Sequence, residues 1–275
     1  MGRDRIKGAQ IDRANKVMKI YFNNSLRDDL SLPTTGGGWL LGDGAFESLR
    51  TYSGRAFALE RHLDRLEQTL NELKIAAPSR AQLVQGVEET IAANPASPFG
   101  RLRITVLGDG NWLVTHMDYK PEARFLKLCL SPIKRYSLDL TSGMKTISYQ
   151  ASAVALRQAA SKGFDDAIFI NERGEVMESA LANLLWLKDG QWFTPELSSG
   201  CLPGVIRSLL VENFGVIQAP LLVEELENVD GLALSSSVRE IVGVQAFESH
   251  LYSNSQPIEV LTSSFHSWIL GNLEQ

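Results

Sequence analysis

The segment Met144-Lys-Thr-Ile-Ser-Tyr149 decides the fold, because it sets a lysine in a short stretch of β character between Gly143 and a predicted helix over Ala151–Lys162. Side chains alternate along an extended segment, so Lys145, Ile147 and Tyr149 are expected on one face. Apolar neighbours lower the pKa of a lysine and make its neutral amine a nucleophile for carbonyl groups. On the local pattern alone, a lysine reaching water at a strand end is the commoner arrangement.

Glu178 is the only charged residue between Val176 and Leu187. A carboxylate among small and apolar residues needs a cation or several hydrogen-bond donors. A protonated pyridine nitrogen would meet that need. The alternative is a glutamate that faces solvent on an edge strand.

Two segments are candidates for holding a phosphate. Ser235-Ser-Ser237 follows the apolar strand Leu232-Ala-Leu234, and Gly200-Cys-Leu-Pro-Gly204 opens a helix expected to reach about Asn213. Both offer backbone N–H groups without partners, although each is equally compatible with a simple cap. Arg65 flanks the apolar stripe of another helix, from which a guanidinium can turn inward or stay in water.

Hydrophobic periodicity divides the rest of the chain into strands and helices. Leu63, Leu66, Leu70 and Leu73 lie on one face of a helix that begins near His62. This order indicates a mixed α/β fold, and the length of 275 residues favours either two compact units or one large α/β unit. The expected divisions are a flexible extension over 1–16, a small N-terminal α/β domain over 17–132, a linker over 133–140 and a larger C-terminal domain over 141–275. Strands are expected over 17–22, 46–52, 56–59, 101–107, 123–130, 167–171, 183–187 and 232–235, and a further helix over 80–93.

Composition excludes several classes of protein. The 275 residues carry a net charge of −5 without a basic stripe, so nucleic acid is not an expected partner. No apolar run approaches the roughly 18 residues that span a bilayer. Cys129 and Cys201 cannot form a disulfide framework, which favours a reducing cytoplasm. The histidines show no metal-ligand spacing, so no metal is expected, and the glycines form no nucleotide-binding motif.

In order and spacing, these segments resemble the class IV family of aminotransferases that depend on pyridoxal 5′-phosphate (PLP), also called fold type IV. That family includes branched-chain aminotransferases, D-amino acid transaminases and 4-amino-4-deoxychorismate lyases. The resemblance extends from about Val17 almost to the end of the chain. It rests on residues 41–50, 62–66, 145–149, 178–183, 199–207 and 234–240.

The resemblance implies a role for each candidate residue. Lys145 would attach PLP as an imine and later shuttle the proton, and Glu178 would bind the pyridine nitrogen. Tyr149 would lie near the cofactor. It also implies a C-terminal domain with a β-barrel-like core, a cofactor in the cleft between the domains, and a homodimer. The phosphate would be held by Arg65, by the N–H groups of Val205 and Ile206, and by Ser236 and Ser237.

The sequence also departs from the family pattern. Leu107-Gly-Asp109 stands where D-amino acid transaminases carry a carboxylate-binding Arg-Gly, which weakens that assignment. Arg103 remains a candidate for binding a substrate carboxylate.

The residues 199–207 and 234–240 look most like those of 4-amino-4-deoxychorismate lyases, as does the short chain. The predicted function is therefore conversion of 4-amino-4-deoxychorismate to 4-aminobenzoate and pyruvate, a step in folate synthesis. A class IV aminotransferase of the branched-chain or D-amino acid type is the first alternative. The second is a small-ligand binding protein without enzymatic activity.

Overall fold

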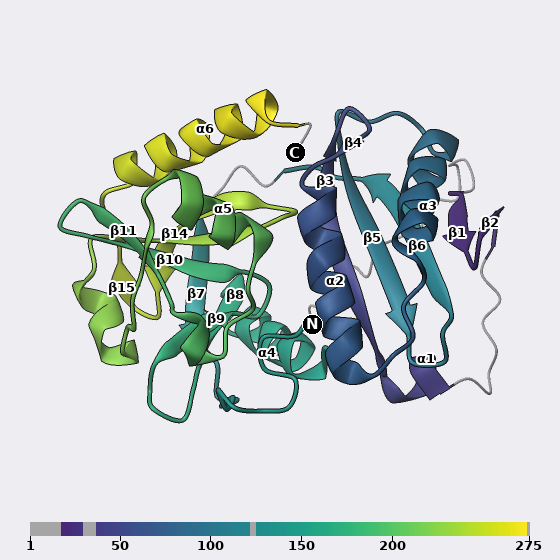
Figure 1. Cartoon of the computed structure of the whole chain (residues 1–275). Coiled ribbons are helices and arrows are strands. Elements are labelled where there is room, and N and C mark those ends of the chain that lie inside the picture. Colours follow the sequence, from purple (N-terminus) through teal and green to yellow (C-terminus); the bar gives the residue numbers. More distant parts are fainter. Residues whose placement is uncertain (1–17, 30–36, 122–124, 274–275) are drawn as a thin grey trace, which may run out of the picture.

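The protein folds around two β-sheets, with helices packed on both (Figure 1). The computed structural model describes residues 18–29, 37–121 and 125–273. The extension expected over residues 1–16 lies outside these ranges. The mixed α/β class expected from the sequence is confirmed. Within the described ranges, no helix is both long and apolar enough to cross a bilayer.

The first sheet is antiparallel throughout, with the strand order β2-β1-β6-β5-β3-β4. Side chains of β5 alternate over residues 101–104: Leu102 and Ile104 are fully buried, whereas Arg101 and Arg103 point to the other face and line a cavity. The strands are β1 (Ile20–Phe22), β2 (Ser25–Arg27), β3 (Gly44–Tyr52), β4 (Arg55–Ala56), β5 (Phe99–Leu107) and β6 (Trp112–Asp118).

Helices α2 (Leu59–Leu73) and α3 (Arg80–Ala93) cover the apolar face of this sheet, and a short helix, α1 (Gly37–Leu41), precedes β3. The predicted apolar face of α2 is confirmed, since Leu63, Leu66 and Leu70 are almost completely buried against the strands. The helix begins at Leu59, so the strand expected over 56–59 is shorter than predicted and ends at Ala56.

The second sheet has the order β12-β11-β10-β13-β14-β7-β8-β9, with β15 attached to β14. Only residues 180–182 separate the edge strand β9 from the inner strand β10 in the chain, and the Ser179 N–H donates to the Ala182 carbonyl at 2.8 Å across this connection. The sheet therefore curls on itself. Its strands are β7 (Leu126–Leu130), β8 (Asp166–Ile170), β9 (Val176–Ser179), β10 (Asn183–Lys188), β11 (Gln191–Thr194), β12 (Ile217–Gln218), β13 (Gly231–Ser236), β14 (Glu240–Phe247) and β15 (His250–Leu251).

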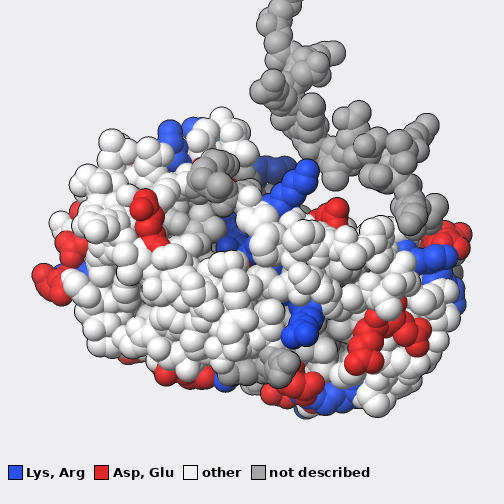
Figure 2. All heavy atoms as spheres, turned by 90° about the horizontal axis from the view of Figure 1, so that it is seen from above, with Lys and Arg blue, Asp and Glu red and all other residues white. Residues whose placement is uncertain are grey.

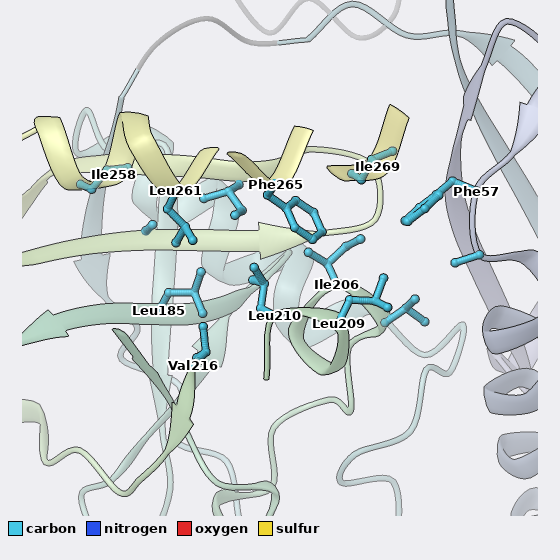
Figure 3. Close-up of a cluster of buried hydrophobic side chains, with 14 of the residues drawn as sticks. Phe57, Leu185, Ile206, Leu209, Leu210, Val216, Ile258, Leu261, Phe265 and Ile269 are labelled. Carbon is cyan, nitrogen blue, oxygen red and sulfur yellow. The ribbon is translucent and has the colours of Figure 1, made fainter. Parts of the chain in front are cut away.

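One core joins the two halves of the molecule (Figure 3). Helices α5 (Val205–Asn213) and α6 (Gln256–Gly271) pack Leu209 and Phe265 against β10, β13 and β14. Phe57, from the half built on the first sheet, packs into the same cluster. Helix α4 (Gln150–Ser161) covers another part of the second sheet, and two 3-10 turns, Leu197–Ser199 and Val223–Asn228, complete the fold.

The expected boundary between the halves needs one correction. The sequence places residues up to 132 in the N-terminal domain, but β7 pairs in parallel with β8 and β14 of the second sheet. Residues 133–140, expected as the linker, also lie against the second half, since the Arg135 N–H donates to the Ile170 carbonyl at 3.2 Å. The strand pattern of β7 was visible in the sequence, but its distant parallel partners were not.

Candidate active site

A cavity of about 780 Å³ lies where the two halves meet. That is a typical volume for a site that binds a small molecule or cofactor. It brings together every candidate residue identified in the sequence. These are Arg65, Arg103, Lys145, Tyr149, Glu178, Val205, Ile206, Ser236 and Ser237.

Backbone hydrogen bonds to the first residues of β3 hold the segment around Lys145 in place. The Lys145 carbonyl accepts the Phe46 N–H at 2.9 Å, and the Ile147 N–H donates to the Gly44 carbonyl at 2.9 Å. This is a single bridge rather than the expected stretch of strand, and Lys145 and Tyr149 line the cavity whereas Ile147 does not. The Lys145 Nζ lies 4.5 Å from the centre of the Phe46 ring. Burial and the nearby Arg65 charge lower the pKa of Lys145 to about 8, so a useful fraction of the amine is neutral near physiological pH.

Glu178, on β9, faces the same cavity with two partners. Its Oε1 accepts from the Arg135 guanidinium at 3.1 Å, and its Oε2 accepts from the Leu202 N–H at 3.0 Å. Burial raises the pKa of Glu178, while Arg135 and the Leu202 N–H oppose that rise. Arg135 is itself fixed by a bond to the Ser152 hydroxyl at 2.8 Å. The carboxylate is therefore held in a defined orientation.

Arg65 reaches the cavity from α2 and is 8% exposed. Its Nε and Nη2 donate to the two oxygens of Glu47 at 2.8 and 2.7 Å, and its Nη1 donates to the Pro203 carbonyl at 2.8 Å. His62 places Nδ1 at 2.6 Å from the same carboxylate. Although burial acts to raise it, Arg65 and His62 hold the pKa of Glu47 far below its ordinary value. Two of the five guanidinium N–H groups remain for a ligand.

Two turns line the same cavity as Arg65 and are candidates for binding an anion. Gly204, the N-cap of α5, makes no side-chain cap, so the first N–H groups of the helix, at Val205 and Ile206, stay open for an anion. Across the cavity, Ser236 lies at the end of β13, and its hydroxyl accepts the Arg239 N–H at 3.3 Å. The Ser235 hydroxyl is buried and has no hydrogen-bond partner in the described part of the chain.

The cavity is strongly cationic although the chain is acidic overall. The Arg103 guanidinium lies 3.7 Å from the centre of the Phe46 ring and bonds to Thr105 at 3.2 Å. It contacts no carboxylate of the described residues, and burial lowers its pKa to about 10. In Figure 2, Lys and Arg side chains gather between the two halves. The lining cations are Arg65, Arg101, Arg103, Lys120, Lys134, Arg135, Lys145 and Arg239, against the acids Asp139 and Glu178.

The residues present fit PLP. Its aldehyde requires an amine of lowered pKa, its pyridine nitrogen a carboxylate, and its phosphate a guanidinium with backbone donors. The cavity supplies all three in Lys145, in Glu178, and in Arg65 with the start of α5. The buried Ser235 hydroxyl without a partner is a further donor for a bound group.

The sequence analysis missed Glu47, Arg135 and Arg239. Glu47 had a detectable signal, since the alternation of the strand Gly44–Tyr52 places it on one face with the apolar Ala45 and Leu49, and all three are fully buried. Arg135 stood in a segment expected to be a linker. Arg239 lies 3.8 Å from the buried Asp166, a pair that only the sheet brings together.

Comparison with known proteins agrees with this geometry. Residues 44–247 match the family described as amino-transferase class IV. The chain belongs to the class IV aminotransferase family. These enzymes are PLP-dependent, so the protein is a PLP-dependent enzyme, and the alternative of a non-enzymatic binding protein is wrong.

Class IV relatives carry more than one activity. A putative branched-chain-amino-acid aminotransferase of Methanocaldococcus jannaschii is 27% identical, covering 88% of this chain and 92% of the relative. The aminodeoxychorismate lyase of Bacillus subtilis is also 27% identical, covering 86% of this chain and 88% of the relative. The crystal structure of a branched-chain aminotransferase from Thermoproteus uzoniensis with norvaline has the same fold, with a TM-score of 0.87 and 20% identity over 94% of this chain and 96% of that one.

Proposed function

We propose that the protein is a PLP-dependent lyase that converts 4-amino-4-deoxychorismate to 4-aminobenzoate and pyruvate. The observation that carries this proposal is the excess of cations in the cavity, above all Arg103 and Arg101 on the cavity face of β5. After one cation binds the cofactor phosphate, several remain for substrate. A substrate with two carboxylates matches them, whereas a branched-chain amino acid offers one carboxylate and an apolar side chain. The lyase among the relatives supports the same activity.

Lys145 is the proposed proton carrier. PLP, when bound, supplies an electron sink for the charge left when a bond beside the substrate amine breaks. With substrate bound, the Lys145 amine would take the proton from the ring carbon that bears the amino group. The C–O bond at the neighbouring ring carbon would then break, the leaving enolpyruvate would take up a proton to become pyruvate, and the ring would become aromatic. The lowered pKa of Lys145 suits a group that must accept and return a proton near neutral pH.

The other residues hold the reacting groups in place. Glu178 would accept the N–H of the pyridine ring, oriented by Arg135 and the Leu202 N–H. Arg65, the open end of α5 and the turn at Ser236 and Ser237 would bind the phosphate. Arg103 would bind a substrate carboxylate, and the ring of Phe46 beside it limits its movement.

The decisive experiment is incubation of the yellow holoenzyme with 4-amino-4-deoxychorismate. We expect 4-aminobenzoate and pyruvate in a one-to-one ratio, and no product from the Lys145→Ala variant. A matched control is Arg157→Met on the exposed face of α4, which should leave turnover unchanged. Absence of 4-aminobenzoate, with ready transfer of the amino group from an amino acid, would contradict the lyase assignment.

Branched-chain transamination is the second candidate, favoured by the Methanocaldococcus jannaschii relative. Its signature is complete conversion of the bound cofactor to the pyridoxamine form by L-valine or L-glutamate. This spectral change, followed without a second substrate, separates the two activities. The proposed lyase should show little conversion with either amino acid.

We also propose that the protein is a cytoplasmic homodimer. Large apolar side chains lie exposed on α1 and on the segment after β7: Leu40 and Leu41 are 72% and 78% exposed, and Leu138 and Leu140 are 92% and 86% exposed. Burying them against a second copy would remove this apolar surface from water. Both cysteines are free and buried, which supports a reducing compartment. Light scattering should give twice the chain mass of 30.4 kDa.

A further inference from the structure

A buried cluster of charged and polar groups ties the first half of the molecule to the second. Glu240, the first residue of β14, is 5% exposed, and Arg50 of β3, its ion-pair partner, is 3% exposed. The Tyr52 hydroxyl donates to Glu240 Oε1 at 2.7 Å, and His266 of α6 places Nδ1 at 2.9 Å from Oε2. Two elements, β3 and α6, therefore converge on a carboxylate of a third, β14.

Glu240 also closes the turn that borders the cavity. Ser236 and Glu240 are paired across β13 and β14, so residues 237–239 form the connecting loop, and Ser236 and Ser237 line the cavity. Glu240 has a φ of 60°, in the left-handed region that side chains with a Cβ rarely adopt. A strained conformation of this kind persists only where the surroundings impose it. The three-residue loop between β13 and β14 ends on this residue, and the bonds to its carboxylate hold the side chain in place.

The partners of Glu240 are rigid. The Arg50 guanidinium stacks on three aromatic rings, with its Cζ 4.4 Å from the centre of Phe99, 5.1 Å from Tyr52 and 5.2 Å from Tyr119. A buried carboxylate held by a fixed guanidinium and a fixed hydroxyl has little freedom to move. The position of β3 therefore determines where the turn lies.

We propose that Glu240 is a positioning residue that holds the Ser236–Arg239 turn in the shape required to bind the cofactor phosphate, with Arg50 and Tyr52 as its anchor on β3. This inference rests on the proposed placement of the phosphate beside Ser236 and Ser237. Glu240 itself does not line the cavity. Its effect on the cofactor is therefore indirect and falls on the phosphate end.

The experiment compares two cofactor forms that differ only in the phosphate. Dissociation constants of PLP and of pyridoxal are measured for the parent protein, for Glu240→Gln and for a control, Glu212→Gln. Glu212 also joins the halves, since its carboxylate accepts two bonds from Arg61 at 2.8 Å each, but it lies at the far end of α5 from the phosphate and is largely exposed. We expect Glu240→Gln to bind PLP roughly tenfold more weakly and pyridoxal within about twofold of the parent. The control should change neither constant.

The outcomes separate the possible failures. Equal weakening of PLP and pyridoxal, or no weakening of either, would overturn the positioning role of Glu240 while leaving the proposed function intact. If the parent itself does not prefer PLP to pyridoxal, the placement of the phosphate fails and this inference fails with it. Should Glu240→Gln not fold, Tyr52→Phe removes one bond to the carboxylate while keeping the ring, and the same selective loss of PLP affinity is then expected in smaller measure.

Discussion

At the scale of single residues, the properties of Lys145 come from its surroundings. The amine sits beside Phe46 in a cavity where burial and Arg65 both disfavour a positive charge. The sequence predicted the direction of this effect from the neighbouring apolar residues. It could not predict the contribution of Arg65, which lies on a helix eighty positions earlier in the chain.

Capture of PLP by the apoprotein should depend on pH through Lys145. The neutral amine is the attacking form, and because its pKa is lowered to about 8, the rate should rise with pH through a midpoint near that value and then level off. Stopped-flow absorbance at the wavelength of the bound cofactor measures the rate. A midpoint above 10, the ordinary range of a lysine, would contradict the lowered pKa.

Glu47 is expected to stabilise the fold as well as to orient Arg65. Glu47→Gln leaves a buried guanidinium without its counter-charge, and we expect a loss of about 3 kcal/mol in the free energy of unfolding at pH 7. Because the pKa of Glu47 is lowered from 4.5, the contribution of its carboxylate is complete above that pH and is lost as the pH falls below it, so the deficit of the variant should shrink in acid.

Urea denaturation at several pH values measures this deficit. The matched control is Glu60→Gln, which removes a carboxylate bonded to Arg80 at the surface and should cost less than about 1 kcal/mol. Equal losses in the two variants would show that Arg65 does not depend on its buried partner.

At the scale of elements, local signals predicted the helices better than the sheets. Helix α3 has the bounds expected from the sequence, because its start is fixed by a capping box between Ser79 and Gln82. Strand β6 was not identified, although its β-rich residues directly follow the Gly108–Gly110 turn. The assignment of β7 to the first half was wrong because strand partners far away in the chain leave no local mark.

The capping box of α3 gives a prediction for that helix. The Ser79 hydroxyl accepts the Gln82 N–H at 3.3 Å, and the Gln82 side chain accepts the Ser79 N–H at 2.9 Å. Ser79→Ala should lower the free energy of unfolding by about 1 kcal/mol. Ser263→Ala, inside α6, should change it by less than about 0.5 kcal/mol, because that exposed hydroxyl donates only to the carbonyls of Glu259 and Val260 in the preceding turn. Thermal or urea denaturation of both variants provides the comparison, and similar losses would rule out the cap.

At the scale of the whole molecule, the order of segments predicted which residues meet, but not how they are supported. All the candidate residues identified in the sequence line one cavity. The bonds by which Glu47 supports Arg65 and Arg135 supports Glu178 became visible only in the folded chain. Glu47 and Arg65 are 18 positions apart, and Arg135 and Glu178 are 43 positions apart. No recurring spacing in a sequence marks such pairs.

The shared core predicts that the two halves unfold together. Phe57, 3% exposed, packs edge-on against Tyr52 and against Trp268 of α6. Phe57→Ala should lower the free energy of unfolding by about 3–5 kcal/mol and speed amide hydrogen exchange in both α2 and α6. Faster exchange confined to α2 would show that the halves are energetically separate.

The backbone bonds that β3 makes to the residues around Lys145 also bear on how such a protein can be recombined. The lysine belongs to the second half of the chain, yet its carbonyl accepts a bond from Phe46 of the first, and Ile147 donates to Gly44 there. A chimera of either half with a counterpart from another member would keep this alignment only if β3 and the residues around the lysine still met in the same register. Variation in substrate preference is therefore easier to obtain by changing side chains that border the cavity than by exchanging whole halves.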